Sequence, residues 1–371
     1  MICVYIFLYC TTYGKGGADL DTLKEYSELY MQYPQPVFLV QDGIVVFANH
    51  NAVSRGIEKG TKVASLISTG MQEYTNFAEG RLLLTVFVNT VTYNAVVKKQ
   101  AEYQVFHLEP QTTQPELQVL ALASQKLREP LANAMLALET LSPGITPEQK
   151  DSLSLLRRSM YQALRSLRNM SDSTNCHSAY TTNLQLMDAN AVVSEIVEKA
   201  AAYLAQASRT VHYHPLTETV FCQIDRNKIE RGILNLISNA ARYSSAESPV
   251  DITLRSGVEK LYICVESQCE KGEQVLAGTL FTGFQREPSL ETKESGIGLG
   301  LTIAHGIATA HKGALLVEHK EDLLRFTLSL SRAQTDHVRL NAPAILYSDQ
   351  AGGYDQALVE LSDVLPAALY E

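Results

Sequence analysis

Two stretches of apolar residues at heptad spacing, separated by a short break, constrain the fold of this chain more than any other feature. Spacing that alternates between three and four residues lays one apolar stripe along a helix. The stripe positions are Leu117, Leu120, Ser124, Leu127, Leu131, Ala134, Leu138 and Leu141 in the first stretch, and Leu153, Leu156, Met160, Ala163, Leu167 and Met170 in the second. We therefore expect two long helices that pack together.

The break between the stripes predicts a tight turn between antiparallel helices. It reads LSPGITPEQ, in which Thr146 is placed to cap the second helix, Pro147 fits its first position and Gln149 completes a capping box. A hairpin of two helices cannot bury both stripes by itself, whereas pairing with a second chain gives a four-helix bundle. We expect residues 114–173 to form a dimerisation hairpin, in a homodimer or a heterodimer.

The region before the hairpin has the pattern of a small antiparallel sheet. Asp42-Gly43 separates two apolar runs, which is a strong hairpin signal, and three more β-rich runs follow between residues 80 and 109. We expect a helix within the N-terminal segment, residues 1–35, and then a sheet domain at residues 36–110. Short helices are expected between its second and third strands.

This order of elements resembles a PAS sensor domain. The residues found where PAS sequences often carry the same types are Asp42, Gly43, Asn49 and Gly60. The resemblance identifies no ligand, and we interpret His50 and His107 as surface or packing residues, not as haem ligands.

Residues 188–332 alternate between helical and strand patterns and contain two motifs that suit phosphate binding. The first, NLISNAARYS, places Asn235 and Asn239 four residues apart, so that both amides project from one helix face. The second, SGIGLGL, has glycines that expose backbone N–H groups and lead into a helix N-terminus, where a phosphate is favoured.

Together these motifs resemble the ATPase domain shared by histidine kinases, chaperone-type ATPases and type II topoisomerases, known as the GHKL or HATPase group. The heptad hairpin upstream is typical of the histidine kinases within that group. The resemblance implies a multidomain α+β protein, with a PAS-like antiparallel sheet, a two-helix dimerisation hairpin and an α/β sandwich ATPase domain of the Bergerat fold.

The family resemblance also implies ATP and Mg²⁺ as cofactors and a response regulator as a partner. Asn239 would hold Mg²⁺, and Asn235 and Arg242 would approach the phosphates. Phe281 and Phe284 match the aromatic box that precedes the mobile lid of this family, and the glycines of the second motif would line that lid. The implied nucleotide-binding residues are Asn235, Asn239, Arg242, Tyr243, Ser267, Phe284, Gly296, Gly298, Gly300 and Leu301.

The first long helix departs from the family at the phosphoacceptor. Histidine kinases carry a stretch like S-H-E-L-R-T-P-L, but residues 124–131 read SQKLREPL, so Gln125 replaces the histidine and Lys126 replaces its acidic neighbour. The nitrogen lone pair of a carboxamide is delocalised, so Gln125 is no nucleophile for a phosphoryl group. The nearest histidines, His107 and His177, lie outside both helices. We expect autophosphorylation to be weak or absent.

A second departure lies on the adenine side of the expected nucleotide site. The family has D-x-G-x-G after the strand KLYICVE, and its aspartate accepts a hydrogen bond from the adenine amino group. Here Ser267 replaces the aspartate, and Cys269 and Lys271 replace the glycines. A hydroxyl can still accept the bond, but we expect adenine binding to weaken by about 1–3 kcal/mol, or roughly 10- to 100-fold.

A third departure concerns removal of phosphate from a response regulator. Family members that do this often use Thr or Asn four residues after the histidine, where this chain has Glu129. Gln125 and Glu129 share one helix face, where an amide can orient an attacking water and a carboxylate can pair with a lysine of the regulator. This gives a response-regulator phosphatase as an alternative function. The alternative, that both are solvated surface residues, is favoured.

Composition limits the remaining functions. The formal net charge of -9 argues against a nucleic-acid partner, which would need a basic face. The six cysteines form no C-x-x-C pair and are interpreted as neutral thiols in a reducing compartment. No membrane segment is seen, because no stretch reaches the roughly 18 apolar residues that span a bilayer. A cytoplasmic location is therefore expected.

The last residues, 333–371, read as a loop followed by a short helix. The apolar face of that helix comprises Leu358, Leu361, Val364 and Leu365. Such a face could dock on a partner, but packing of the tail on its own ATPase domain is favoured.

Three functions compete at this point. The first is a degenerate signalling protein that binds a regulator or pairs with an active kinase. The second is an ATP-dependent kinase that phosphorylates a histidine on a partner chain. The third, a plain ATPase of the chaperone or topoisomerase type, lacks support because those proteins do not carry the heptad hairpin.

Overall fold

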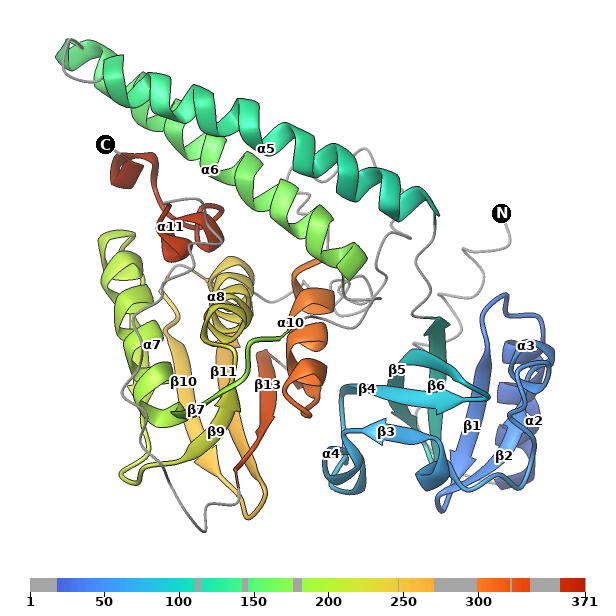
Figure 1. Cartoon of the computed structure of the whole chain (residues 1–371). Coiled ribbons are helices and arrows are strands. Elements are labelled where there is room, and N and C mark those ends of the chain that lie inside the picture. Colours follow the sequence, from blue (N-terminus) through green and yellow to red (C-terminus); the bar gives the residue numbers. More distant parts are fainter. Residues whose placement is uncertain are drawn as a thin grey trace.

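The computed structural model describes residues 19–110, 115–141, 146–175, 182–245, 247–269, 299–320, 322–333 and 354–370 (Figure 1). Four residues of the expected nucleotide site or its lid therefore lie outside the described residues, namely Phe281, Phe284, Gly296 and Gly298. The apolar opening of the chain and Lys271 also lie outside them.

An antiparallel sheet forms the N-terminal part, in the strand order β2-β1-β6-β5-β4. Its strands are β1 (Val37–Gln41), β2 (Ile44–Ala48), β4 (Arg81–Val88), β5 (Val91–Gln100) and β6 (Tyr103–Pro110), with the short β3 (Ile67–Thr69) paired to β4. Helix α2 (Asp19–Met31) precedes the sheet, and α3 (His50–Val53), η1 (Val63–Ser65) and α4 (Met71–Thr75) lie between β2 and β4. The predicted hairpin is confirmed: Asp42 and Gly43 both have positive φ and join β1 to β2.

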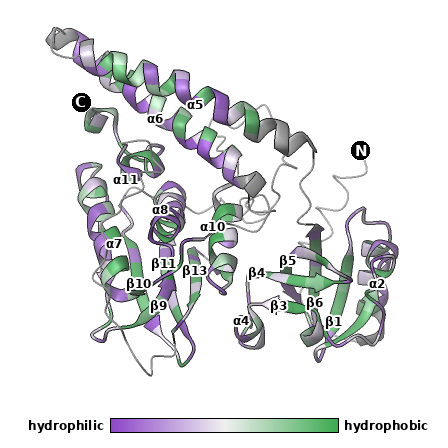
Figure 2. Cartoon of the chain, viewed as in Figure 1, coloured by the Kyte–Doolittle hydropathy of each residue, from purple (hydrophilic) through white to green (hydrophobic). Residues whose placement is uncertain are grey.

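The two long helices are α5 (Pro115–Leu141) and α6 (Pro147–Asn175), and they pack side by side (Figure 1). The predicted capping box is supported by the contact of Gln149 with the helix start, because the Thr146 amide donates to Oε1 of Gln149 at 3.2 Å. Figure 2 shows apolar and polar residues mixed along both helices. Within one chain the stripes are only partly covered: Leu127 is 53% exposed and Leu156 is 47% exposed.

The third part is a sheet covered on one face by helices, as expected for an α/β sandwich. Its strand order is β12-β13-β11-β10-β8, and only β10 and β8 are parallel. The strands are β8 (Val211–His214), β10 (Val250–Ser256), β11 (Lys260–Gln268), β12 (Leu315–Lys320) and β13 (Leu323–Ser331). The covering helices are α7 (Ala189–Gln206), α8 (Arg226–Tyr243) and α10 (Leu299–Ala310), and a separate pair is formed by β7 (Gln185–Asp188) and β9 (Phe221–Ile224).

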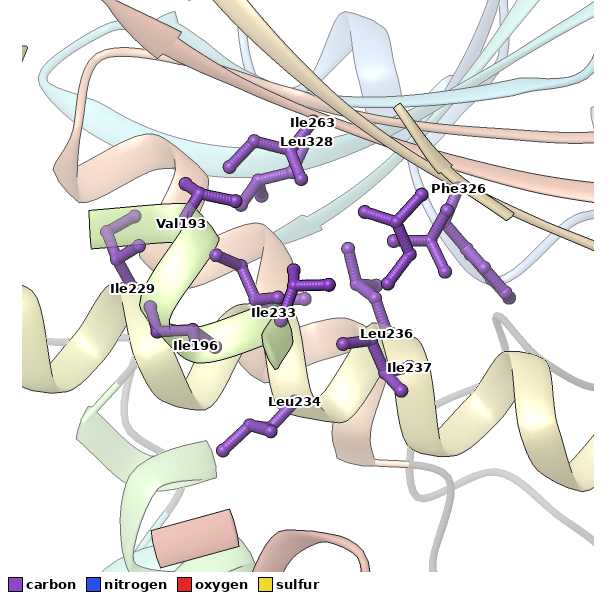
Figure 3. Close-up of a cluster of buried hydrophobic side chains, with 14 of the residues drawn as sticks. Val193, Ile196, Ile229, Ile233, Leu234, Leu236, Ile237, Ile263, Phe326 and Leu328 are labelled. Carbon is purple, nitrogen blue, oxygen red and sulfur yellow. The ribbon is translucent and has the colours of Figure 1, made fainter. Parts of the chain in front are cut away.

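Apolar side chains from these helices and strands form one core (Figure 3). Ile233 and Leu236 of α8 meet Ile263 of β11 and Phe326 of β13, and all four are fully buried. This packing holds α8 against the sheet. The polar side chains of α8 that project away from the sheet are thereby held in fixed positions.

The two sheets are joined edge to edge, which the sequence did not indicate. Strand β4 pairs with β12 in antiparallel register, with Leu83 opposite Leu315 and Arg81 opposite Val317. The result is a continuous sheet of eleven strands. Polar contacts support the joint, because Glu73 of α4 lies 3.5 Å from the Lys260 ammonium.

The C-terminal residues pack on the ATPase-like part, as favoured from the sequence. Helix α11 (Gln356–Glu360) is shorter than expected, and the chain continues through turns to η4 (Ala367–Tyr370). Leu361 and Leu365 are fully buried in the core cluster of the third part. Among the described residues, no helix is long and apolar enough to cross a membrane.

Candidate functional site

The two asparagines of the first motif lie on α8, which begins where Asp225 caps it by accepting from the Lys228 amide at 3.3 Å. Asn235 is fully buried and Asn239 is half-buried. The Asn235 side-chain amide donates to the Arg231 carbonyl at 3.1 Å, whereas its Oδ1 has no hydrogen-bond partner in the structure. A buried amide oxygen without a partner is costly, so this atom suits a ligand.

Gly300, in the first turn of α10, lies directly over the two asparagines. A Cβ built at Gly300 would lie 3.0 Å from Asn235 Oδ1 and 3.5 Å from Asn239 Nδ2. The absence of a side chain is what allows α10 to approach α8 this closely. Leu301, the next residue, is buried in the core and therefore anchors the start of α10.

Arg242 and Tyr243 lie in the last turn of α8. The Arg242 guanidinium lies 5.9 Å from the centroid of the Tyr243 ring, within range of a cation–π contact. Its Nη1 also lies 3.9 Å from a carboxylate oxygen of Asp363. Both side chains are half-buried, one helical turn beyond Asn239.

Ser267 lies near the end of β11, on the face that the helices cover. Its side chain is 2% exposed, and its Oγ has no hydrogen-bond partner in the structure. The next strand residue on that face, Cys269, forms an isolated bridge with Ser244 just after α8. The hydroxyl therefore faces the helix layer, as an acceptor for an adenine amino group would.

The described residues fit ATP and Mg²⁺ on both the phosphate side and the adenine side of the expected site. Asn235 Oδ1 is an unpartnered buried atom, the Gly300 backbone lies close to both asparagines, and Ser267 Oγ is an unpartnered acceptor. In the described ranges, no group of three or more His, Cys, Asp or Glu side chains could hold a metal. Mg²⁺ bound together with a nucleotide usually takes one or two protein oxygens, the phosphates and water.

The residues at the expected phosphoacceptor position are in solvent. Gln125, Lys126 and Glu129 are all exposed on α5, whereas Ser124 is buried. The position is therefore accessible to a protein partner. The side chains that occupy it are an amide, an ammonium and a carboxylate, none of which is a phosphoacceptor histidine.

The histidines and cysteines considered from the sequence differ in their exposure. His107 packs edge-on against the rings of Tyr30 and Tyr33, with centroids 5.4 and 5.6 Å away, and burial lowers its pKa to about 4. His50 is exposed. Burial raises the pKa of the Cys222 thiol to about 11, which keeps it neutral as expected. Cys3, Cys10 and Cys176 lie outside the described residues.

A buried ionic cluster beside Asn235 was missed from the sequence. Glu360 of α11 is fully buried and accepts from Asn235 Nδ2 at 3.2 Å. Three guanidinium groups surround it, those of Arg165, Arg168 and Arg231, at 3.5, 3.6 and 3.1 Å. The pKa of Arg231 is lowered to about 10, mainly by burial; Glu360 opposes this shift and the neighbouring arginines add to it.

The available signal for this cluster was weak. Glu360 interrupts the apolar face of the tail directly before Leu361, and a carboxylate within an apolar face needs a buried partner. The sequence did not reveal which arginines would supply it, because α6, α8 and α11 meet only through tertiary packing.

Residues 224–334 match the family model described as "Histidine kinase-, DNA gyrase B-, and HSP90-like ATPase". Among curated proteins, the chain is 25% identical over 230 residues to "Histidine kinase P4" of Formosa agariphila, covering 59% of this chain and 17% of that protein. It is 33% identical over 118 residues to "Sensor protein VanSC" of Enterococcus gallinarum, covering 32% of each.

Among solved structures, the chain is similar to that titled "Crystal structure of ShkA full-length in complex with AMPPNP", with a TM-score of 0.46 and 19% identity. That match covers 58% of this chain and 46% of the other. The chain spans only part of its curated relatives: 17%, 30% and 58% of the lengths of three of them.

Proposed function

We propose that this chain is a two-component histidine kinase family protein with a HATPase_c domain, which binds ATP with Mg²⁺ but does not phosphorylate itself. It acts instead by binding a response regulator or by pairing with an active kinase through its helical hairpin. The observation that carries this proposal is the exposed pair Gln125 and Lys126 on α5.

The chemistry of that pair argues against a phosphohistidine. An exposed carboxamide has no nucleophilic nitrogen lone pair, and an ammonium beside it cannot accept a proton from an attacking group. A solvent-exposed position on a long helix remains suited to contact with a regulator. The hairpin thus keeps a docking surface while losing its phosphoacceptor.

The nucleotide half of the proposal rests on the residues around Asn235. When bound, Mg²⁺ would neutralise phosphate charge, and the oxygen of Asn239 is the ligand this chain offers it. Asn235 and Arg242 would hold the phosphates, and Ser267 Oγ would accept from the adenine amino group. The neutral Ser267 predicts weaker adenine binding than an aspartate in its place.

We further propose that the N-terminal sheet is a PAS-like sensor. Support comes from its strand order, β2-β1-β6-β5-β4, with short helices between β2 and β4. Asn49 has a structural role there, because its Oδ1 accepts from the amides of Val37 and Ala52 and so ties α3 to β1.

A second candidate, phosphorylation of a histidine on a partner chain, is favoured by one observation. Asn235, Asn239 and Gly300 lie together, so the phosphate side of the site does not share the loss seen at Gln125. Such a reaction needs an ATP domain in this chain and a histidine in the partner.

One labelling experiment separates the two. The protein is incubated with γ-labelled ATP and Mg²⁺, alone and with candidate partner kinases whose own ATP sites are inactivated, and acid-labile phosphate is measured. We expect no label on this chain. Label on the partner would support the second candidate, and label on this chain would refute the assignment of Gln125.

A restored variant supplies the positive control. Gln125→His with Lys126→Glu returns both the nucleophile and its acidic neighbour to an exposed position, so it should not disturb the core. Label on the double variant but not on the parent would locate the defect at these two residues. Label on neither, with nucleotide still bound, would place a further defect in the ATPase domain.

A further inference from the structure

The C-terminal segment, residues 354–370, bridges the helical hairpin and the ATPase-like part (Figure 1). On the hairpin side, Arg158 of α6 donates to the carbonyls of Ser362 and Asp363 at 3.1 and 3.3 Å, and Gln162 donates to Ser362 at 3.2 Å. On the other side, Gln356 donates to the Asn227 carbonyl of α8 at 3.0 Å. The segment is therefore held from both sides.

The two carboxylates of this segment contact the residues assigned to the phosphates. Glu360 accepts from Asn235 Nδ2 at 3.2 Å, and Asp363 lies 3.9 Å from Arg242. Asp363 also pairs with Arg165 at 2.6 Å. Two anionic groups thus contact the side of the site where nucleotide phosphates would be expected.

The ion pairs around Glu360 are close but poorly aligned. Three guanidinium groups lie within 3.6 Å of its carboxylate, those of Arg165, Arg168 and Arg231. Neither Oε1 of Glu360 nor the guanidinium nitrogen that each arginine turns toward the carboxylate has a hydrogen-bond partner in the structure. A phosphate presents several anionic oxygens in a tetrahedral arrangement and can satisfy such donors better. This makes the carboxylate replaceable by a phosphate.

We propose that the C-terminal segment is an internal competitor of the nucleotide, with Glu360 and Asp363 in the place of phosphate oxygens. This inference rests on the proposed ATP binding. A phosphate cannot accept from Asn235 Nδ2 while Glu360 does, and two anions at this spacing repel. The nucleotide can therefore enter fully only when the segment leaves, and binding of either one excludes the other.

The competition has a measurable size. The apparent affinity of a ligand is its intrinsic affinity multiplied by the fraction of molecules in the binding-competent state. The Asp363 ion pair is partly exposed, so its loss should weaken docking of the segment by about 1 kcal/mol and tighten nucleotide binding about fivefold. Loss of the fully buried Glu360 charge should tighten nucleotide binding more, by at least about tenfold.

The test uses full-length protein and titration calorimetry with Mg²⁺ and the non-hydrolysable analogue AMPPNP. Asp363→Asn and Glu360→Gln are compared with the parent chain. Glu218→Gln, which removes an exposed carboxylate outside the segment, is the matched charge control and should bind as the parent does. Circular dichroism establishes that each variant is folded.

Removal of a nearby negative charge alone could also tighten nucleotide binding, so a second readout is needed. Hydrogen exchange of the parent chain is measured with and without saturating AMPPNP. Because coupling between two sites is reciprocal, nucleotide should raise exchange of the amides in residues 356–370. A bound nucleotide that leaves their exchange unchanged would overturn the proposal.

The outcomes also separate this inference from the proposed function. If the carboxamide variants bind nucleotide more tightly and exchange rises, competition is supported. If all variants bind nucleotide equally, competition fails and ATP binding stands. If neither the parent nor any folded variant binds nucleotide, the proposed ATP binding itself fails, and the competition fails with it.

Discussion

A side chain at Gly300 would place its Cβ 3.0 Å from Oδ1 of Asn235, closer than a β-carbon normally approaches an oxygen. Asn235 is fully buried and Gly300 lies in the first turn of a helix, so neither can move away without shifting a whole element. This contact fixes the distance between α10 and the asparagines. It also makes Gly300 the most sensitive position of the described part of the site.

Gly300→Ala should therefore weaken nucleotide binding without unfolding the chain. Overpacking of this kind costs about 1–3 kcal/mol, which is roughly a 5- to 150-fold loss of affinity for Mg²⁺–AMPPNP by calorimetry. Gly232→Ala on α8 is the matched control, because its Cβ would meet Ile307 at an ordinary 3.4 Å. Equal affinity of Gly300→Ala and the parent would show that the nucleotide does not use this contact.

The half-exposed stripe of the hairpin leads to a prediction about association. Leu127→Glu places a charge on the stripe, and burying it in a dimer should raise the dissociation constant at least about 100-fold. Leu122→Glu is the matched control, since Leu122 is 60% exposed but lies on the opposite face of α5. Analytical ultracentrifugation measures both. A dimer equally weakened by the two variants would contradict pairing through the stripe.

Local patterns in the sequence predicted the elements well. Asp42-Gly43 specified a turn because both residues tolerate positive φ, and Thr146 with Gln149 marked the start of α6 through contacts within one turn. Asn235 and Asn239 were placed together because a helix repeats its faces over short distances. In each case the deciding interaction lies within a few residues.

Contacts between distant elements could not be predicted in this way. Any exposed strand edge can pair with another, so nothing in β4 indicated that it would join β12 across two sheets. Glu360 likewise meets Arg165 and Arg231, which are well over a hundred residues away in the sequence. The side of the candidate site formed by the C-terminal segment was missed for this reason.

The joint between the two sheets depends on Gly80, which precedes β4. Its φ is +92°, and a Cβ there would lie 2.6 Å from the carbonyl oxygen of Val317. Gly80→Ala should therefore separate β4 from β12, and hydrogen exchange of the amides of Leu315–Val317 should rise. The measurement is exchange followed by mass spectrometry on the parent and the variant.

Gly60→Ala isolates the effect of the contact. Gly60 has a similar φ of +93° but nothing within 4 Å of its Cβ position, so both variants carry the same backbone cost of about 1–2 kcal/mol. Only Gly80→Ala should change exchange in β12. Equal exchange in the two variants would mean that the joint does not depend on this close approach.

The buried His305 predicts that stability falls in mild acid. His305 is fully buried in α10, and desolvation lowers its pKa to about 4, against about 6.5 in an unfolded chain. Between these values the unfolded state binds the proton and the folded state does not, so the free energy of unfolding rises with pH. The stabilisation is complete above about pH 6.5 and is lost progressively as pH falls toward 4.

The size of this effect follows from the difference in pKa, at about 1.4 kcal/mol per unit. Between pH 6.5 and 5 the parent should lose about 1.6 kcal/mol more than His305→Leu, which removes the titrating group. Urea unfolding at several pH values measures the difference. Burial also lowers the pKa values of His107 and His311, so part of the slope persists in His305→Leu. A slope in His305→Leu equal to that of the parent would mean that His305 is protonated within the fold, which its buried surroundings oppose.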